Sequence, residues 1–425
     1  MNTEKPNQLL RVLTLKDAVG VGLGAIIGAG IFVVTGVAAG ISGPAFLIGL
    51  FIAGSIATCN ALSSAQLAAA YPFAGGTYDY GNRLLKPVFG FIAGWMFLIS
   101  KLAAGSVVAI GFGSYFYQLI PIGTPEIIAI AAIVLLCIAN LFGIKKTGNL
   151  NLCIVGFTIL VLIYLIFSGV PKIEKVNFTP FAPFGITGIA EATALLFFAF
   201  TGYARIATLA EEVKNPKVTI PKAIIITIVT AIILYGFVSV VAIGVIGTEA
   251  MAGSTSPLQV VAEKLTTPGI QTFVALGACT AMLGVLLSQI LGISRMFFAM
   301  ARNKDFFPPF QKISERFKVP TIAILSTGGI IMLLVIFGSF EFVLASAAFS
   351  ILLYYSITNI AAMRQSEVDR LYAKGIPVLG LIGCLLMAFS LHWKVIISGI
   401  ALLIIGLLFR FLLHRGLAKT NTPQN

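Results

Sequence analysis

The sequence predicts an all-α protein that crosses a membrane about twelve times, and three observations carry this prediction. Of its 425 residues, 58% are hydrophobic and only 10% are charged, with a mean hydropathy of +1.02, whereas soluble domains carry about 25% charged residues. Turn and charge clusters divide the chain into about twelve apolar runs of the roughly 20 residues that a spanning helix needs. The basic residues gather in alternate connections between these runs, as in polytopic membrane proteins.

The expected spans follow one another with short polar connections. They lie near 17–40, 44–70, 86–118, 126–143, 150–169, 188–212, 221–247, 270–302, 320–337, 340–363, 376–392 and 394–414. Residues 1–16 are polar and precede a long apolar run without a small-residue cleavage motif, so we expect a cytoplasmic segment here and not a removable signal peptide. The outer connections 170–187 and 248–269 are long enough to carry short helices over an outer vestibule.

The net charge of +13 is explained by basic residues that gather on one side of the membrane. With the N-terminus inside, the inner connections hold about 21 of the 28 Lys and Arg, and the outer ones hold about four. This asymmetry predicts that both termini are cytoplasmic, and we expect the protein to reside in the inner (plasma) membrane of a cell. It accounts for the charge without a nucleic-acid partner.

The reactive side chains argue against an enzyme. The five cysteines lie in apolar runs without paired spacing, which is typical of packing residues. The only two histidines, His392 and His414, lie near span ends, so neither a metal site nor a histidine-based catalytic site is expected. The phosphate-binding pattern GxxxxGK[ST] does not occur. We therefore expect no enzymatic activity, no cofactor and no metal.

The first span contains an unusual run of glycines. Residues 20–36 read GVGLGAIIGAGIFVVTG, and each glycine in a helix interior costs about 1 kcal/mol relative to alanine. One interpretation is close packing against neighbouring helices, as in small-xxx-small patterns. The other is that the helix breaks near Gly28 and Gly30.

A second interrupted helix favours the break. Residues 194–214 read ALLFFAFTGYARIATLAEEVK, an apolar helix divided by the small polar pair Thr201 and Gly202. Each interrupted helix opens a set of five spans, which predicts two inverted repeats at 17–169 and 188–363 and a substrate site at the midplane between the breaks. The last two spans, at 376–414, have no break, so we expect a peripheral or dimer-contact role for them in a monomer or homodimer. A cytoplasmic tail follows at 415–425.

The unpaired backbone of two breaks predicts what binds there, because such groups in a membrane need partners. The helix beginning near Ile31 would accept a carboxylate through the amides of Gly28, Ala29 and Gly30. Carbonyl groups left free in both breaks would accept an ammonium group, and these are the carbonyls of Ile26, Ile27, Phe198 and Phe200. A zwitterion with both charges on adjacent atoms, an α-amino acid, fits both sets.

Five spaced motifs show a family resemblance. They are GAGIFV in the first span, GPA at 43–45, YPFAGGTYDY at 71–80, FFAFTGYARIATLAEEVKNP at 197–216 and LGVLLSQILGISRMFFAMARNKDFFPPF at 283–310. Together, and in this order through nearly the whole chain, they resemble the amino acid, polyamine and organocation superfamily of transporters. The resemblance implies ten core helices in two inverted repeats, two peripheral helices, alternating access and an amino acid held by the broken first and sixth helices.

The resemblance also implies roles for side chains near the breaks. It places the substrate side chain against Thr201, Gly202 and Tyr203. Many relatives have an acidic residue after the aromatic residue that follows the break, where this chain has Ala204 and then Arg205. Proton-coupled relatives of one branch carry a lysine in the fifth helix, where this chain has Thr158. A hydroxyl group such as that of Thr158 or Ser288 is an alternative ligand for a sodium ion, because hard cations take oxygen ligands.

Few ionisable residues lie inside the spans, where they are costly and usually functional. Lys101 is about fifteen residues from either end of its run, too deep to reach water along the helix. It is expected to balance a carboxylate or to take part in proton coupling, and the alternative is that it snorkels toward a polar cavity. Glu191 begins the sixth span, where a favourable contact with the helix dipole also explains it. Arg295, near the cytoplasmic end of its span, is expected to snorkel.

Arg205 follows the second break on its cytoplasmic side. Its permanent charge predicts an inner-gate ion pair with Asp17, Glu211 or Glu212. The alternative is direct contact with the substrate carboxylate.

These features predict a secondary active transporter that moves amino acids by alternating access. Proton-coupled symport of a neutral amino acid is the first expectation, with a proton or alternatively sodium as the coupling ion. Obligate exchange of amino acids or amines is the alternative, favoured by the absence of a lysine from 149–169. A channel-like facilitator is a more distant alternative, since no repeated selectivity-filter segment is visible.

Overall fold

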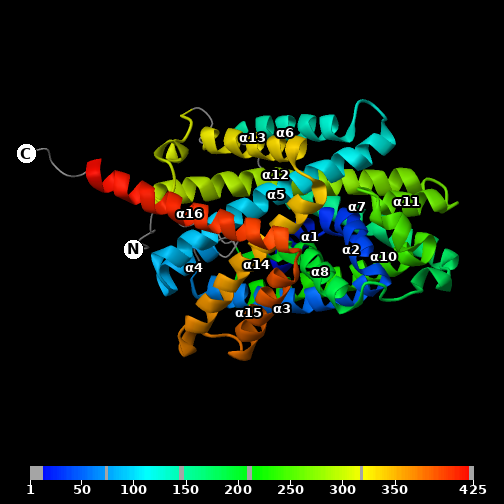
Figure 1. The fold of residues 1–425 in the computed structure, drawn as a ribbon, viewed down its shortest axis with the longest axis horizontal. Helices are drawn as coiled ribbons and strands as arrows, with labels where there is room; N and C mark the ends of the chain where they lie inside the picture. Colours follow the sequence, from blue (N-terminus) through cyan, green and yellow to red (C-terminus); the bar gives the residue numbers. More distant parts are fainter. Residues whose placement is uncertain (1–12, 72–74, 143–147, 208–212, 316–318, 421–425) are drawn as a thin grey trace, which may run out of the picture.

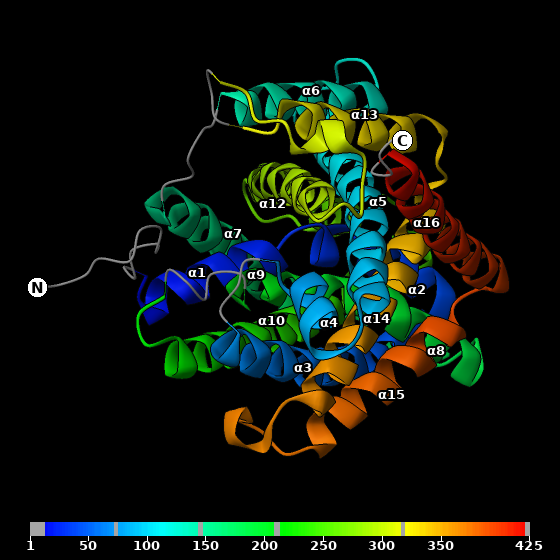
Figure 2. The same ribbon diagram turned by 90° about the vertical axis from the view of Figure 1, so that its left-hand side faces the viewer.

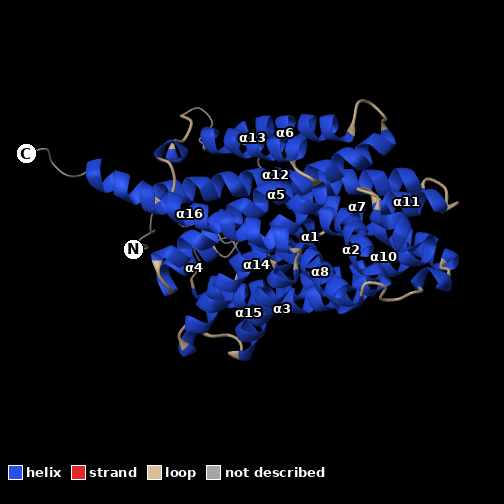
Figure 3. Cartoon of the chain, viewed as in Figure 1, coloured by secondary structure: helices blue, strands red, loops and turns tan. Residues whose placement is uncertain are grey.

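A computed structural model describes residues 13–71, 75–142, 148–207, 213–315 and 319–420. Every named element in these ranges is a helix, and their one strand-type contact is an isolated bridge between Leu13 and Val213. Figure 3 shows the helices joined by short loops. The prediction of an all-α protein is confirmed.

The helices follow the expected spans closely. In chain order they are α1 (Leu15–Ile26), α2 (Thr35–Ser42), α3 (Phe46–Ala70), α4 (Thr77–Leu84), α5 (Pro87–Leu119), α6 (Pro125–Leu141), α7 (Gly148–Gly169), α8 (Gly185–Phe197), α9 (Ala204–Ala207), α10 (Pro216–Ala252), α11 (Pro257–Lys264), α12 (Ile270–Arg302), α13 (Thr321–Phe337), α14 (Phe340–Arg364), α15 (Gly375–Ser390) and α16 (Trp393–Thr420). Short helices of other types connect or interrupt them, and two of these, η1 (Gly30–Val34) and η5 (Phe198–Tyr203), lie at the predicted breaks.

Length and composition make this a multi-pass membrane protein. Within the described residues, eight helical stretches are long and apolar enough to cross a bilayer. The first of them, Leu15–Ala70, runs through both of the first two expected spans. The three shorter apolar helices α6, α13 and α15 coincide with expected spans as well. Each expected span therefore has its helix.

The outer surface of the bundle is apolar, as contact with lipid requires. Figures 1 and 2 show α6 and α13 side by side at one edge, with α16 on the outside of the bundle. Leu135 on α6, Phe337 on α13 and Leu412 on α16 are 66%, 80% and 65% exposed. Such large exposed apolar side chains would be a liability in water.

Both interrupted helices contain a real break in their hydrogen-bonding pattern. The first α-helix ends at Ile26, Ile27 has extended backbone angles (φ −75°, ψ 100°), and the chain resumes as the π-helix η1. The second passes from α8 through six residues of 3₁₀-helix, η5, into α9. The predicted break positions near Gly28–Gly30 and Thr201–Gly202 are confirmed.

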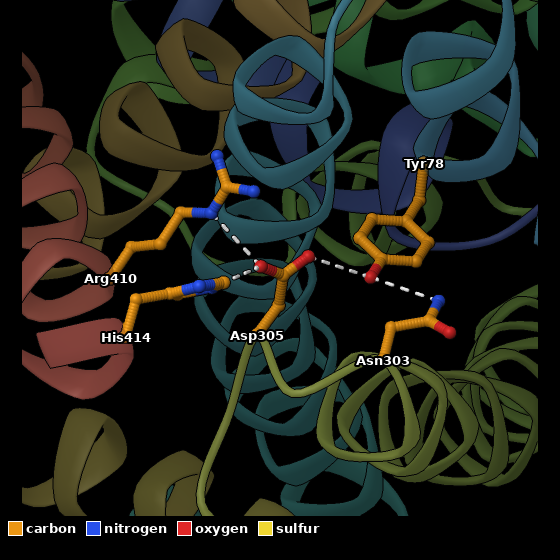
Figure 4. A network of polar contacts seen from close by, with 5 residues as sticks. All are labelled: Tyr78, Asn303, Asp305, Arg410 and His414. Carbon is orange, nitrogen blue, oxygen red and sulfur yellow. Dashed lines mark hydrogen bonds and ion pairs between the residues drawn. The ribbon is translucent and has the colours of Figure 1, made fainter. Parts of the chain in front are cut away.

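A polar cluster fastens the C-terminal helix to the bundle at the side of the N-terminus. Asp305, in the connection after α12, has a side chain only 6% exposed; it accepts hydrogen bonds from Tyr78 of α4 (2.8 Å) and Arg410 of α16 (2.9 Å). His414 of α16 lies 3.4 Å from the same carboxylate, and Asn303 donates to the Tyr78 hydroxyl (3.1 Å). Figure 4 shows the three elements converging on Asp305. Burial and the Asp305 charge raise the pKa of Tyr78, so its hydroxyl stays protonated and donates.

Candidate functional site

The two breaks touch each other at glycine residues. A Cβ atom on Gly30 would lie 2.6 Å from the Cα atom of Ala199 in η5. One on Gly202 would meet the backbone of Ala25 at the end of α1. Neither position has room for a side chain, so glycine is what allows the backbones to cross. The glycine-rich run therefore both packs closely against a neighbouring segment and contains a break in the helix, and Gly30 takes part in both.

A small cavity of about 40 Å³ lies at this crossing. Its lining includes Gly28, Ala29 and Gly30 from the first break, together with Phe198 and Thr201 from the second. The predicted carboxylate-binding amides and the predicted substrate contacts are thus brought together around one space. Lys101 of α5 and Gln289 of α12 complete its polar lining.

A larger cavity of about 260 Å³ adjoins the small one and shares six lining residues with it: Ala25, Lys101, Thr201, Gly202, Val285 and Gln289. Its remaining lining includes Val21 from the α1 side of the first break and Arg205 from the α9 side of the second, together with residues of α5, α7, α12 and α14. It therefore extends from the crossing toward the side of the N-terminus.

The 3₁₀ geometry of η5 decides which of its side chains face these cavities. With three residues per turn, side chains three apart line up in rows. Two rows, Phe198 with Thr201 and Ala199 with Gly202, line the small cavity.

The third row of η5, Phe200 with Tyr203, lines neither cavity. Both side chains are fully buried and pack against other rings, Phe200 on Tyr235 (5.5 Å) and Tyr203 on Tyr355 (5.3 Å). Neither side chain therefore faces either cavity, and the substrate contacts predicted for Tyr203 and for the Phe200 carbonyl stay predictions.

Protein groups already use some of the carbonyls expected to be free. The Ile26 carbonyl accepts a hydrogen bond from the Tyr235 hydroxyl (2.8 Å), and the Phe198 carbonyl accepts one from Thr201 (3.0 Å). A carbonyl oxygen has two lone pairs, so the Ile26 carbonyl retains capacity for one more donor, whereas the Phe198 carbonyl also accepts within the i→i+3 pattern of the 3₁₀-helix η5. Ile27, at the end of α1, also lines a third cavity described below.

Lys101 borders both cavities, whereas the other cation in their linings, Arg205, borders only the larger one. No Asp or Glu is among the residues that line either cavity. Within the described chain its ammonium group forms no ion pair or hydrogen bond. A charged amine without an anion is unfavourable in such a place, so this position favours an anion or a neutral amine.

The two hydroxyl groups considered for sodium lie apart. Thr158 of α7 lines a third cavity of about 10 Å³, beside Ile27 of the first break. Ser288 of α12 instead lines the larger cavity. Each hydroxyl donates to the carbonyl four residues earlier in its own helix, at 2.9 Å and 3.0 Å. Of these two hydroxyl groups, that of Thr158 therefore lies beside the first break. Its cavity is about the size of one small ion or water molecule.

The other charged candidates differ in position. Arg205 lines the larger cavity. Asp17 accepts hydrogen bonds from the backbone and hydroxyl of Thr14 and so caps the start of α1. Glu191, on α8, lines neither cavity. Two further candidate partners of Arg205, Glu211 and Glu212, lie outside the described residues. Arg295 is exposed, as expected of a residue that snorkels.

Some lining residues were not expected from the sequence. Gln289 lines both cavities, and Phe97, Asn151 and Tyr354 line the larger one. Gln289 lies in the motif LGVLLSQILGISR that carries part of the family resemblance, and that motif was the available signal. Phe97 and Tyr354 belong to apolar helices whose cavity-facing side the pattern of residues does not distinguish.

On the side of α2, buried contacts cover the crossing. The hydroxyl of Tyr115 on α5 donates to the Phe32 carbonyl of η1 (2.7 Å) and accepts from the Leu258 amide of α11 (3.2 Å). Phe32, Tyr115 and Leu258 are all fully buried. The short helix expected in the connection 248–269 is present as α11, and it takes part in this cover.

Comparisons with known proteins agree with this architecture. A family model described as amino acid permease matches residues 13–419. An uncharacterized transporter of Mycobacterium tuberculosis is 37% identical over 406 residues, covering 94% of this chain and 91% of the relative. A branched-chain amino acid permease of Bacillus subtilis is 29% identical over 447 residues, covering 99% and 96%. A vacuolar cationic amino acid transporter of Arabidopsis thaliana is 30% identical over 361 residues, covering 77% and 58%.

Proposed function

This chain belongs to the amino acid permease family, and we propose that it is a proton-coupled symporter of a neutral amino acid. Amino acid transport across a membrane is what the family supports. The symport mechanism, the choice of proton and the neutral substrate are our proposal. The observation that carries it is the crossing of two broken helices around a cavity whose one unpaired charge among the described residues is Lys101.

At the crossing, the substrate would be bound through the carboxylate and ammonium groups that α-amino acids share. The amides of Gly28, Ala29 and Gly30 would take the carboxylate, since helix N-termini favour anions. The second lone pair of the Ile26 carbonyl, with the Ile27 carbonyl, would take the ammonium group. A cationic side chain is disfavoured because Lys101 and Arg205 border the space and no carboxylate does.

Proton coupling would follow from the isolation of Lys101. Without substrate, its charged form has no described anion beside it, and an unpaired charge inside a membrane is unfavourable. A substrate that brings acceptor oxygen atoms favours the protonated form, so binding of substrate and proton would assist each other, and by linkage equally in both directions. No lysine in α7 is needed for this coupling.

Alternating access would use the arrangement already described. The larger cavity leads toward the N-terminal side, while Tyr115, Phe32 and Leu258 cover the crossing on the other. We assign the N-terminal side to the cytoplasm of a plasma membrane from the distribution of Lys and Arg. The two interrupted helices open the inverted repeats 17–169 and 188–363, and α15 with α16 stay peripheral, in a monomer or a homodimer.

Obligate exchange is the alternative within the same fold, and uptake into proteoliposomes separates the two. Labelled amino acids are offered to empty vesicles under an inward proton gradient, and to vesicles preloaded with unlabelled amino acids without a gradient. The proposal expects gradient-driven accumulation that a protonophore abolishes. Uptake that requires preloading and ignores the gradient would establish an exchanger, and uptake that does not saturate would indicate a channel.

A further inference from the structure

One tyrosine of a neighbouring helix touches both breaks. Tyr235 lies on α10, its side chain is fully buried, and it lines none of the three cavities. Its hydroxyl group donates to the Ile26 carbonyl of the first break (2.8 Å), and its ring packs on Phe200 of the second (5.5 Å between ring centroids). Tyr235 therefore contacts the backbone that forms the site without facing the space inside it.

The carbonyl that Tyr235 contacts has another possible partner in its own segment. In a continuous α-helix the Ile26 carbonyl would accept from the amide of Gly30, four residues later. Here α1 ends at Ile26, Ile27 is extended (ψ 100°), and this bond between two described residues is not formed. The break thus separates an acceptor from a donor, and both residues line the small cavity. The Gly30 amide is one of the three that we expect to bind the substrate carboxylate.

The Tyr235 hydroxyl group occupies the Ile26 carbonyl in place of that amide. Unpaired backbone groups are costly inside a membrane, so without another donor the carbonyl and the amide would pair with each other and the helix would close. Closure would take the amide from the carboxylate and the carbonyl from the ammonium group together. The hydrogen bond from Tyr235 satisfies one lone pair of the carbonyl and leaves the other for the substrate.

The second break has the same arrangement. The hydroxyl group of Tyr355, on α14, donates to the Thr201 carbonyl (3.2 Å), which in a continuous α-helix would accept from the amide of Arg205. Tyr355 is also fully buried and lines none of the three cavities. A tyrosine hydroxyl group from another helix thus occupies a backbone carbonyl at each break. Packing alone would require only the rings, so the two hydroxyl groups point to a role in holding the breaks open.

We propose that Tyr235 is a positioning residue for the substrate. Its hydroxyl group keeps the first break open, so that the Ile26 carbonyl is available to the ammonium group and the Gly30 amide to the carboxylate. This rests on the proposed function, because it assigns how that site is kept ready for an amino acid. The groups concerned are those that all α-amino acids share, so the role of Tyr235 does not depend on the substrate side chain.

The variant Tyr235→Phe tests this role, because it removes the hydroxyl group and keeps the ring on Phe200. Labelled alanine, serine, leucine, phenylalanine and glutamine are offered to wild-type proteoliposomes, and the one with the lowest half-saturation concentration is used for the comparison. In the variant this concentration should rise at least about fivefold, as loss of a hydrogen bond predicts, while the maximal rate per folded protein changes less than about twofold. A purely structural role would lower the maximal rate and leave the half-saturation concentration unchanged, and that result would overturn the proposal.

Tyr164→Phe is the matched control. The Tyr164 hydroxyl group also donates to a backbone carbonyl, that of Pro268 (2.9 Å), and its ring also packs on a phenylalanine, Phe273, but it lines none of the cavities. This variant should keep the wild-type half-saturation concentration. Replacement of Tyr235 by 4-aminophenylalanine keeps a donor at the same place and should bring the concentration back to within about twofold of the wild-type value. An equal rise in Tyr164→Phe, or no recovery with 4-aminophenylalanine, would overturn the proposal.

Hydrogen exchange tests the open break without substrate. In the purified wild-type protein the amides of residues 28–30 should exchange faster than those within α1, because unpaired amides are less protected. In Tyr235→Phe they should exchange more slowly than in the wild-type protein, since the Gly30 amide then pairs with the Ile26 carbonyl, whereas general destabilisation would speed their exchange. Wild-type amides at 28–30 that are as protected as those of α1 would overturn the proposal even if the variant does not fold. Failure of the proposed function gives a different result, because no amino acid would then show saturable uptake while this exchange pattern remains.

Discussion

At the residue scale, Gly30 and Gly202 matter because backbones cross where they lie. Their missing side chains allow η1 to touch η5 and α1 to touch Gly202. The same contact leaves the amides of Gly28, Ala29 and Gly30 beside a cavity. Packing and binding therefore depend on the same atoms, so substitution here tests both.

Replacement of Gly30 should strongly weaken substrate binding while the protein still inserts and folds. In Gly30→Leu the side chain would displace η5 and fill the crossing, since even a Cβ atom falls 2.6 Å from Ala199. Binding measured by substrate-induced thermal stabilisation should weaken at least about tenfold, which corresponds to about 1.4 kcal/mol. Gly236→Leu on α10 is the control, because a Cβ atom there has no neighbour within 4 Å. Normal uptake by Gly30→Leu would remove the crossing as the substrate site.

The sequence predicts site residues well where the backbone at a helix break forms the site. It predicts them less well where the rotation of a helix about its axis decides which side chains face the cavity. Gly28, Gly30 and Thr201 line the small cavity as expected. Phe200 and Tyr203 face the core, because a 3₁₀ segment rotates its residues by about 120° instead of about 100° each. Gln289 was missed, since one polar residue on an apolar helix does not show which neighbour it faces.

At the element scale, Tyr115 of α5 joins two elements that cover the crossing. Its hydroxyl links η1 to α11 through Phe32 and Leu258. If the protein alternates access, these two hydrogen bonds must break before the site opens on that side.

The variant Tyr115→Phe should therefore favour the state open on the side of α11. It removes two hydrogen bonds of about 1 kcal/mol each while the ring keeps its edge contact with Phe32 (5.8 Å). A cysteine introduced at Phe32 should react faster with a membrane-impermeant thiol reagent added from that side when Tyr115 is Phe. Equal labelling rates in both backgrounds would show that Tyr115 does not hold the cover closed.

The cluster at Asp305 is the second element-scale feature, because it docks α16. Asp305→Asn removes the charge that compensates Arg410, whose side chain is only 13% exposed. Loss of one partner of a buried ion pair typically costs about 3 kcal/mol. We expect a lower thermal unfolding temperature and faster proteolysis of the C-terminal segment.

The exposed pair of Glu367 and Lys374 provides the control for this substitution. Its side chains are 79% and 63% exposed, and such surface pairs contribute little to stability. Glu367→Gln should leave both measurements unchanged. If Asp305→Asn behaves in the same way, the cluster does not fasten α16.

Helices could be predicted well from the sequence because membranes demand long apolar runs ended by charge, Pro or Gly. Pro87, Pro125 and Pro216 each occupy the first helical position of α5, α6 and α10, where proline is tolerated. The docking of α16 could not be predicted, since Tyr78, Asp305 and Arg410 are far apart in the chain and only the tertiary fold brings them together.

At the scale of the whole molecule, charge and space lie on one side of the crossing. The larger cavity, with Lys101 and Arg205 in its lining, extends toward the N-terminal side, while the opposite side is covered by buried contacts. This asymmetry is what a transporter needs in order to expose one bound molecule to one side at a time. Our central claim is that the binding of an amino acid at this crossing is coupled to a proton through Lys101.

Proton movement caused by the substrate tests this claim most directly. Proteoliposomes containing a pH-sensitive dye receive a neutral amino acid outside, without an imposed gradient, and Lys101→Met and Lys101→Arg are compared with the wild-type protein. We predict that the wild-type vesicles acidify inside, and that neither variant couples proton movement to uptake, because Met has no charge and Arg keeps its charge permanently. Unchanged acidification in Lys101→Met, or wild-type uptake without acidification, would contradict the account.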